Sequence, residues 1–381
     1  MEGLCKVAVS GFRSLRHVEL GGFNGPTVLI GPNGAGKSNL LSLLRLVSFL
    51  NSGSLGRFVG EAGGASALLH YGPKRTRELE FTLEFQLAPQ AGRPIATNAY
   101  HARLGYAAGD RFVFLEEEVG FQPRSDGDFT WQSLGAGHFE SRLSELSSER
   151  TAKTTRWFLE RINFFHFHDT SVSSAIRGYA RPEDSRYLRS DGSNLAAFLL
   201  ALKESEGAEE RAAWQRTIGM IRKVAPFIKD LSPAVSSGGL ATTFQAGGVR
   251  LDWLDDRDEL FGPHHLSDGT LRAIALITAL GQPISRLPLF ISIDEPELGL
   301  HPAALALICG LVHSVTSRSQ VLLSTQSPEV LDHFSAESVV VVERHEGASV
   351  FKRLEPERLA AWLDEYSLSE LYDKNLLGGR P

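Results

Sequence analysis

The chain has 381 residues, of which 42% are hydrophobic and 22% charged, a composition that allows a real globular core and excludes wholesale disorder. Its two cysteines, Cys5 and Cys309, are too few for a disulfide framework or a cysteine zinc cluster. The net charge of -6 argues against a broadly basic nucleic-acid binder, although a local basic patch stays open. We see no signal peptide or membrane-spanning stretch, so we expect a cytoplasmic protein without a membrane partner.

The first part of the chain is predicted to be strand-rich. Apolar alternation predicts strands at 6–10 and 18–20, and a short apolar strand, Thr27–Ile30, leads into a glycine-rich loop. Apolar residues spaced three and four apart after Ser38 predict a helix. Residues 52–64 are rich in Gly and Ser and predict a mobile loop, and alternation returns over about 79–121.

The second part mixes helices and short strands, which predicts an α/β core interrupted by a long α+β insertion. We expect an N-terminal part of the core at 1–90, an insertion at 91–235, a C-terminal part of the core at 236–345 and a tail at 346–381. The predicted elements are helical segments within 194–230, short strands around 240–253, a helix after Gly269, a buried strand at 287–293, a helix at 303–316, a strand at 320–324 and a mixed tail from Gly347.

The segment Gly31-Pro-Asn-Gly-Ala-Gly-Lys-Ser38 has the spacing of a phosphate-binding loop between a strand and a helix. Glycines let backbone N–H groups turn toward phosphate oxygens, Lys37 reaches the β and γ phosphates, and the Ser38 hydroxyl suits Mg²⁺. We therefore predict ATP and Mg²⁺ as cofactors. The expected nucleotide contacts of this segment are Asn33, Gly34, Gly36, Lys37, Ser38 and Asn39.

Two adjacent carboxylates, Asp294 and Glu295, end the predicted buried strand. In a P-loop enzyme the first acid lies beside Mg²⁺, and the second can activate or position the attacking water. Farther upstream, Leu266-Ser-Asp-Gly-Thr270 opens a helix. Ser267 or Asp268 is either a plain N-cap or, with Gly269, part of a γ-phosphate site. Gln326 ends a later strand in Ser-Thr-Gln-Ser-Pro and is expected to sense the same phosphate.

The sequence resembles ABC-type ATPases of the RecF and SMC kind. The resemblance rests on five motifs in this order: the phosphate loop, the Leu-Ser-x-Gly helix, the Asp-Glu pair, Gly-Leu-His-Pro and Ser-Thr-Gln-Ser-Pro. The sequence is most similar to compact bacterial AAA15/OLD-like ATPases, through Gly11-Phe-Arg-Ser-Leu15, His166-Phe-His-Asp-Thr170, 186–195 and the ending Leu377–Pro381. The resemblance implies an ATP-dependent homodimer in which Ser267 and Gly269 serve the partner's nucleotide, and it places Arg13 near the phosphates.

Two departures from the wider ABC pattern concern turnover. Asp268 replaces a glycine of the LSGGQ signature, and Gln326 stands where many relatives carry a histidine. An acid near the γ-phosphate and a glutamine that cannot be protonated both favour slow hydrolysis. The Q-loop glutamine, a metal ligand in the wider family, is assigned to Gln86 at the end of a strand.

Several residues leave alternatives open. His166, His168 and Asp169 could ligate a metal, but their aromatic neighbours favour a partly buried strand end. His264 and His265 either approach the partner's nucleotide or lie in a plain loop. Acids are interspersed among six arginines, which favours a solvated surface over a DNA-binding patch; the arginines are at 181, 186, 189, 211, 216 and 222.

The leading functional hypothesis is an ATPase switch in DNA maintenance or phage defence that acts with DNA or a separate effector protein. An OLD-type nuclease is disfavoured because the chain after Pro328 is too short for a Toprim domain. A transporter subunit is disfavoured by the long insertion and the imperfect signature.

Overall fold

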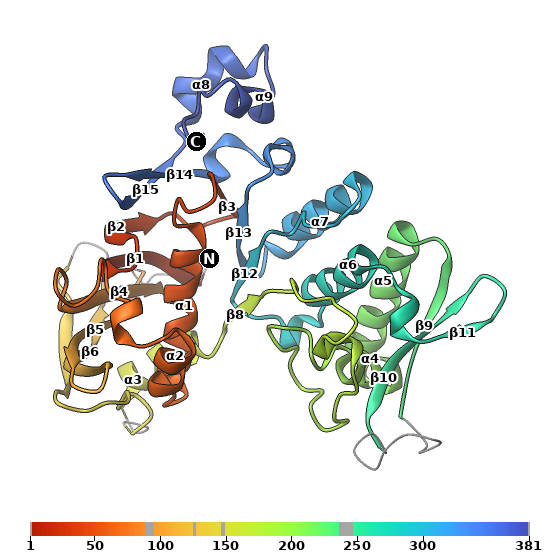
Figure 1. Cartoon of the computed structure of the whole chain (residues 1–381), viewed down its shortest axis with the longest axis horizontal. Helices are drawn as coiled ribbons and strands as arrows, with labels where there is room; N and C mark the ends of the chain where they lie inside the picture. The colour runs from red at the N-terminus through yellow and green to blue at the C-terminus, as the bar shows by residue number, and fades with distance from the viewer. Residues whose placement is uncertain (1, 88–94, 125–126, 146–148, 236–246, 380–381) are drawn as a thin grey trace. The chain divides into compact units, whose positions relative to one another are not determined.

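The computed structural model describes residues 2–87, 95–124, 127–145, 149–235 and 247–379. The chain forms two compact units (Figure 1). Unit 1 comprises Met1–Asn163, Pro288–Ser292 and Arg318–Pro381, and unit 2 comprises Phe164–Leu287 and Ile293–Ser317. Two predicted boundaries, 90/91 and 235/236, touch segments outside the described residues, as do the residues 240–246 of the predicted strands and the last two residues of the chain.

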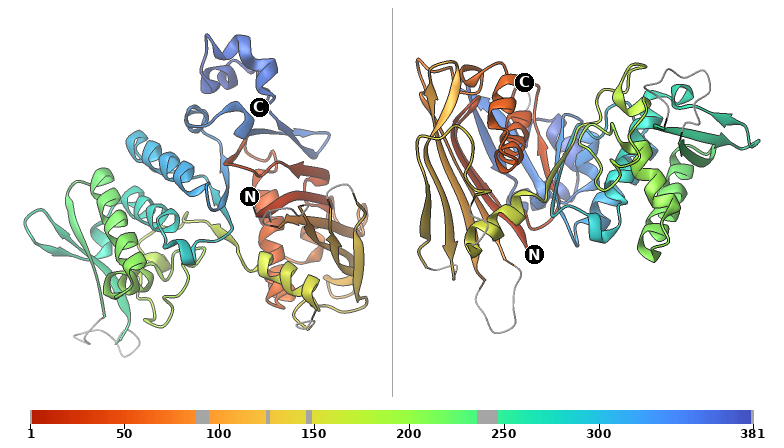
Figure 2. Two further views of the ribbon diagram at one scale, coloured as in Figure 1. Left: turned by 180° about the vertical axis from the view of Figure 1, so that it is seen from behind. Right: turned by 90° about the horizontal axis from the view of Figure 1, so that it is seen from below.

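The N-terminal half of unit 1 is an antiparallel sheet in the order β2-β1-β4-β5-β6-β7. Its inward positions are apolar at every second residue, as half-buried strands require. Helices α2 and α3 pack against β6 (Figure 2). The strands are β1 Gly3–Phe12, β2 Leu15–Gly21, β4 Glu78–Gln86, β5 Thr97–Ala107, β6 Arg111–Gln122 and β7 Thr130–Gly135, and the helices of this half are α1 Lys37–Asn51, α2 Leu55–Glu61 and α3 Arg150–Leu159.

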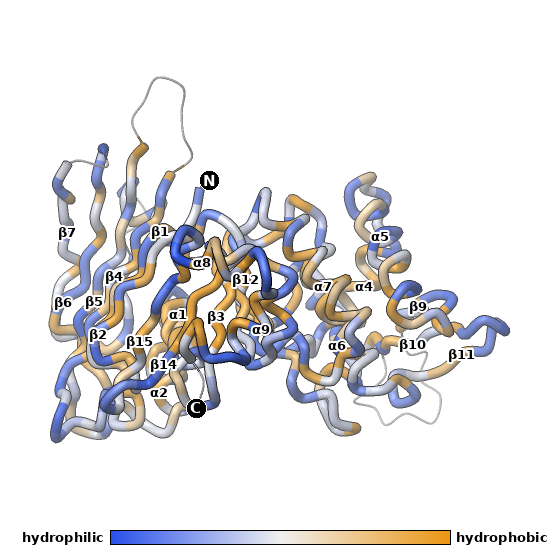
Figure 3. The backbone as a smooth tube through the Cα atoms, turned by 90° about the horizontal axis from the view of Figure 1, so that it is seen from above, coloured by the Kyte–Doolittle hydropathy of each residue, from blue (hydrophilic) through white to orange (hydrophobic). Residues whose placement is uncertain are grey.

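A second sheet carries the phosphate loop, in the order β15-β14-β3-β13-β12-β8. Strand β3 runs parallel to both β13 and β14. Strands β3 and β12 are mostly hydrophobic (Figure 3), and all their residues except Asp294 are buried, as expected for strands covered on both faces. The bounds are β3 Thr27–Ile30, β8 Ile162–Phe165, β12 Phe290–Asp294, β13 Gln320–Thr325, β14 Val339–His345 and β15 Ala348–Arg353, followed by α8 Pro356–Leu363 and α9 Leu368–Asp373.

The buried side chain of Gln320 joins the two sheets of unit 1. Its Nε2 donates to the Leu4 and Phe23 carbonyls at 2.7 and 2.8 Å, and its Oε1 accepts from the Leu4 amide at 2.8 Å. Three charge-neutral hydrogen bonds therefore satisfy this polar group where burial without partners would be costly.

Unit 2 is a helical group with a small antiparallel sheet, β11-β10-β9. Helix α4 packs on β9 and β10, and α5 packs on α4, α6 and α7. The bounds are α4 Leu195–Glu204, α5 Ala208–Val224, β9 Ile228–Val235, β10 Val249–Asp255, β11 Leu260–Phe261, α6 Asp268–Leu280 and α7 Pro302–Val315.

One predicted loop is wrong. Within residues 52–64 the chain forms helix α2, because Leu55, Phe58 and Val59 recur at helical spacing and bury one face. The prediction of a loop relied on the many glycines and serines of this segment and overlooked the short apolar pattern. The helical region predicted within residues 194–230 ends earlier than expected, because α5 ends at Val224 and β9 begins at Ile228.

Candidate functional site

The phosphate loop lies between β3 and α1, with glycines where a side chain would collide. Gly34 and Gly36 have φ of 77° and 115°, in the left-handed region that favours glycine. A Cβ at Gly31 would meet the Val342 carbonyl, and one at Gly36 would meet the Ser349 hydroxyl. Asn33, Gly34 and Ser38 are exposed. The loop therefore exposes backbone to solvent at the N-terminus of a helix, which is an arrangement that binds anions.

Lys37 is 5% exposed although it carries a charge. Its Nζ donates to the carbonyls of Gly31 at 2.5 Å and Pro32 at 3.1 Å. The ammonium therefore lies inside the loop, where a bound phosphate would meet a cation already desolvated by the protein.

Three polar side chains brace the loop: Asn39, which the sequence predicts as a nucleotide contact, and Ser14 and Ser349, which it does not assign to the site. Asn39 Nδ2 donates to Ser14 Oγ at 2.6 Å, Ser14 Oγ and Ser349 Oγ share a 2.6 Å hydrogen bond, and Ser349 Oγ donates to the Ala35 carbonyl at 2.5 Å. Ser14 and Ser349 are 335 residues apart. No local pattern marks Ser349, so only the fold reveals it.

Arg13 precedes the brace residue Ser14 and has a strained backbone, with φ of 47°. Its amide donates to the Leu68 carbonyl at 2.8 Å, and its carbonyl accepts from His70 Nδ1 at 2.5 Å. Burial lowers the pKa of its guanidinium. These two hydrogen bonds fix the backbone of Arg13 next to Ser14, which contacts Asn39 at the start of α1.

Gln326 and Gln86 occupy different parts of unit 1. Thr325 pairs with Ile30, so Gln326 follows β13 at the sheet edge where the phosphate loop begins. Gln86 pairs with Gly3, whereas Ser14 of the brace lies beyond Phe12 at the other end of β1. At about 3.3 Å per residue, these ends of the strand are about 30 Å apart. This register argues against the assignment of Gln86 to the nucleotide's metal.

The acidic pair lies at the end of β12. Asp294 is its last residue, with a side chain 14% exposed. Glu295 follows with φ of 47°, a left-handed conformation that costs a non-glycine residue free energy. His168 Nε2 lies 3.1 Å from the Asp294 carbonyl oxygen, and His166 Nδ1 lies 3.9 Å from Asp294 Oδ2. Asp169 is not part of this group, since its carboxylate accepts from Ser171 Oγ at 2.6 Å.

The start of α6 is held by a buried arginine. Ser267 is the N-cap and accepts from the Thr270 amide at 3.1 Å. Arg177, 4% exposed, donates to the carbonyls of Thr170 and Pro263 and to Asp268 Oδ1 at 2.8 Å. Ser267 and Asp268 are exposed, so the helix start faces solvent with its carboxylate oriented by Arg177.

A second buried arginine, Arg272, connects α6 to the segments around the acidic pair. It donates to the Phe167 and His168 carbonyls at 2.8 and 2.9 Å and to the Leu298 carbonyl. Burial lowers the pKa of the Arg272 guanidinium, and the nearby carboxylates of Asp268 and Glu295 offset this lowering only in part. One guanidinium of α6 thus binds the backbone of two other segments of unit 2, at 167–168 and at Leu298. No sequence pattern marks Arg177 or Arg272 as part of the site.

A family profile described as "AAA domain, putative AbiEii toxin, Type IV TA system" matches residues 27–332. The match covers most of the chain, from the strand before the phosphate loop to the segment after Gln326. The chain belongs to this AAA family. Its glycine loop and acidic pair are therefore parts of an AAA-type ATPase domain. No curated protein matches the sequence.

Solved structures agree on the fold of this AAA protein. A Smc head bound to the C-winged helix domain of ScpA is 16% identical with a TM-score of 0.58, and covers 94% of this chain and 99% of its own. A Pyrococcus furiosus Smc head, also bound to a ScpA domain, is 16% identical (TM-score 0.57; 96% and 99% covered). One from Pyrococcus yayanosii is 12% identical (TM-score 0.54; 96% and 99% covered). The predicted α/β, ABC-type P-loop ATPase fold is confirmed. Among the described residues, no helix combines the length and apolarity needed to span a membrane.

Proposed function

We propose that this AAA protein binds ATP with Mg²⁺ and hydrolyses it slowly, as a switch that closes into an ATP-dependent homodimer. The observation that carries the proposal is the loop Gly31–Ser38, in which Gly31 and Gly36 leave no room for a side chain and Lys37 is buried against loop carbonyls. We place the chain with the compact AAA15/OLD-like ATPases.

The proposed roles follow the chemistry of the donors. The Ser38 hydroxyl and the Asp294 carboxylate are oxygen ligands of the kind that Mg²⁺ prefers, so the residues fit this ion. Bound Mg²⁺ would neutralise phosphate charge. Glu295 activates or positions the attacking water, Gln326 contacts the γ-phosphate side, and Arg13 adds positive charge near the phosphates.

Assembly supplies the rest of the site in this proposal. Ser267, Asp268 and Gly269 present a helix N-terminus that is exposed in one chain, and a partner's γ-phosphate would fit it. Two identical chains related by a two-fold axis close two such sites at once. Asp268 and Gln326 make turnover slow, because one adds negative charge near the phosphate and the other cannot carry a proton.

We assign the switch to phage defence or DNA maintenance, in company with a separate effector protein or DNA. The family description names a toxin of a toxin–antitoxin system, which favours an effector-linked role over a transporter subunit. If DNA is the partner, binding will require ATP and will weaken steeply with salt, because contacts to phosphates release counterions. Equal and negligible DNA binding with and without ATP would leave a protein effector.

The direct test of the chemistry is phosphate release from Mg·ATP by the full chain, with Glu295→Gln measured beside it. We expect slow turnover in the wild type and much slower turnover in the variant. Equal rates would overturn the role of Glu295, and no ATP binding at all would overturn the proposal.

A further inference from the structure

Two imidazoles and one carboxylate gather at the end of β12. The group, called here the histidine cluster, consists of His166, His168 and Asp294, and one ligating atom from each lies within 4.8 Å of the others. The rings of His166 and His168 stack with centroids 3.8 Å apart and planes 23° apart. His166 is 59% exposed and Asp294 14%, so the cluster has one open side and one protected side.

The cluster is held from behind by hydrogen bonds to its backbone. The His166 amide donates to the Ser190 carbonyl at 2.8 Å. Arg272 donates to the carbonyls of two consecutive residues, Phe167 and His168. These contacts fix the spacing of the two histidines without using their side chains, which is the support a ligand site needs.

The His168 ring is also oriented. In the tautomer that donates from Nε2 to the Asp294 carbonyl at 3.1 Å, the lone pair of His168 is on Nδ1. A ring nitrogen that donates to a carbonyl while the other nitrogen faces a cation is the usual arrangement of a metal-bound histidine. The neighbouring Asp169 is not part of the cluster, and its Oδ1 accepts from the amide and hydroxyl of Ser171 at 3.1 and 2.6 Å.

We propose that the histidine cluster binds a divalent transition metal ion such as Zn²⁺, Mn²⁺ or Co²⁺. Metal–ligand distances of about 2.0–2.2 Å place ligand atoms about 3–4 Å apart, which fits the 3.9 Å between His166 Nδ1 and Asp294 Oδ2. Imidazole nitrogen selects transition metals, whereas Mg²⁺ and Ca²⁺ prefer oxygen. The ion therefore differs in class from the nucleotide's Mg²⁺.

The inference rests on the proposed function only in sharing Asp294 with the Mg²⁺ of the nucleotide site. The cluster needs no nucleotide to form. It gives this ATPase a response to transition metals, since an ion on Asp294 changes the charge beside Glu295.

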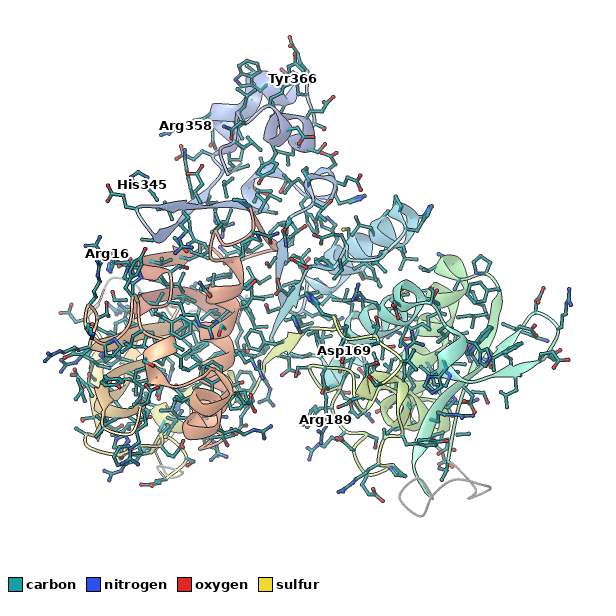
Figure 4. The ribbon with its side chains drawn as sticks, viewed as in Figure 1. Arg16, Asp169, Arg189, His345, Arg358 and Tyr366 are labelled. Atoms are coloured by element: carbon teal, nitrogen blue, oxygen red, sulfur yellow. The ribbon has the colours of Figure 1, made fainter. Side chains whose placement is uncertain are left out.

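The test is a titration of the nucleotide-free full chain with CoCl₂ in excess Mg²⁺, followed by visible absorption of the bound Co²⁺. We expect one Co²⁺ per chain, displaced by Zn²⁺. His166→Ala and His168→Ala should each weaken binding at least about tenfold, the lower bound for disturbing a metal site. Asp169→Asn, beside the cluster, and the exposed His345→Gln (both positions labelled in Figure 4) should bind like the wild type.

Two results overturn the inference: no saturable Co²⁺ binding, or binding that survives in the His166→Ala/His168→Ala double variant. Circular dichroism of each variant is compared with that of the wild type. A variant that loses Co²⁺ binding with an unchanged spectrum has lost a ligand and has not misfolded. Phosphate release from Mg·ATP is measured in parallel. Turnover without a Co²⁺ site refutes the cluster alone, whereas a Co²⁺ site without ATP binding refutes the proposed function alone.

Discussion

The phosphate loop of unit 1 and the α6 start of unit 2 are both exposed helix N-termini, but they are built differently. The loop is shaped by glycines and braced by neutral groups, Asn39, Ser14 and Ser349. The α6 start is held by two buried cations, Arg177 and Arg272, which donate mainly to backbone carbonyls.

This difference indicates a separate role for each of the two helix N-termini. A braced loop with a buried Lys37 is preorganised and brings its own charge for an anion. At the α6 start the two cations, Arg177 and Arg272, are buried, whereas Ser267 and Asp268 are exposed to solvent. The first end suits a tightly held nucleotide, and the second suits a contact that forms and breaks. The predictions below test that division.

The largest effect is expected for Lys37→Ala. ATP binding, measured by calorimetry, should be lost, because the loop loses its side-chain cation. The exposed Lys74→Ala is the matched control and should bind as the wild type does. Unchanged affinity in Lys37→Ala would contradict the loop assignment.

Glu295→Gln should keep ATP binding and slow phosphate release by a factor of about 10²–10⁴, the typical worth of a general base. The substitution keeps the size of the side chain and its φ, so thermal unfolding should not change. A rate within twofold of the wild type would remove Glu295 from the chemistry.

Arg177→Ala should destabilise unit 2 by about 2–4 kcal/mol, because buried carbonyls lose a charged donor. Arg189→Ala breaks only a surface pair with Asp184, at 2.6 Å, and should cost less than about 1 kcal/mol (Figure 4). Urea unfolding compares the two variants. ATP binding at the loop of the intact Arg177→Ala protein should be retained, and equal stability of the two variants would contradict the role of Arg177.

The smallest effect is expected for Glu295→Gly. Glycine relieves the left-handed φ of 47°, worth about 1 kcal/mol, so this variant should be at least as stable as Glu295→Gln. Its turnover should be equally low. A less stable glycine variant would show that no strain is stored at this position.

The sequence was sufficient where the chemistry is local. Strand β3, the loop and α1 are consecutive, and the glycine spacing needs no distant partner to be recognised. The same holds for β12 with Asp294 and for the Ser267 cap. The short helix α2 was missed because three apolar residues are a weak signal among glycines and serines.

Contacts between distant segments could not be predicted. Arg272 lies more than a hundred residues from the Phe167 carbonyl it binds, and Ser349 lies more than three hundred from Ala35. Gln86 was chosen because it ends a strand, but only the pairing register shows which end of the sheet it occupies. His166 and His168 follow β8 and their rings stack, yet the carboxylate beside them is that of Asp294 and not that of the adjacent Asp169.

The most direct test of the central claim is sedimentation of Glu295→Gln with Mg²⁺ and either ATP or ADP. We predict a dimer with ATP and a shift toward monomer with ADP, because only ATP offers a γ-phosphate to the partner's α6 start. Adding Ser267→Arg should abolish the ATP-dependent dimer while leaving ATP binding intact. A mass that ignores the nucleotide, or a Ser267→Arg protein that still dimerises with ATP, would contradict the account.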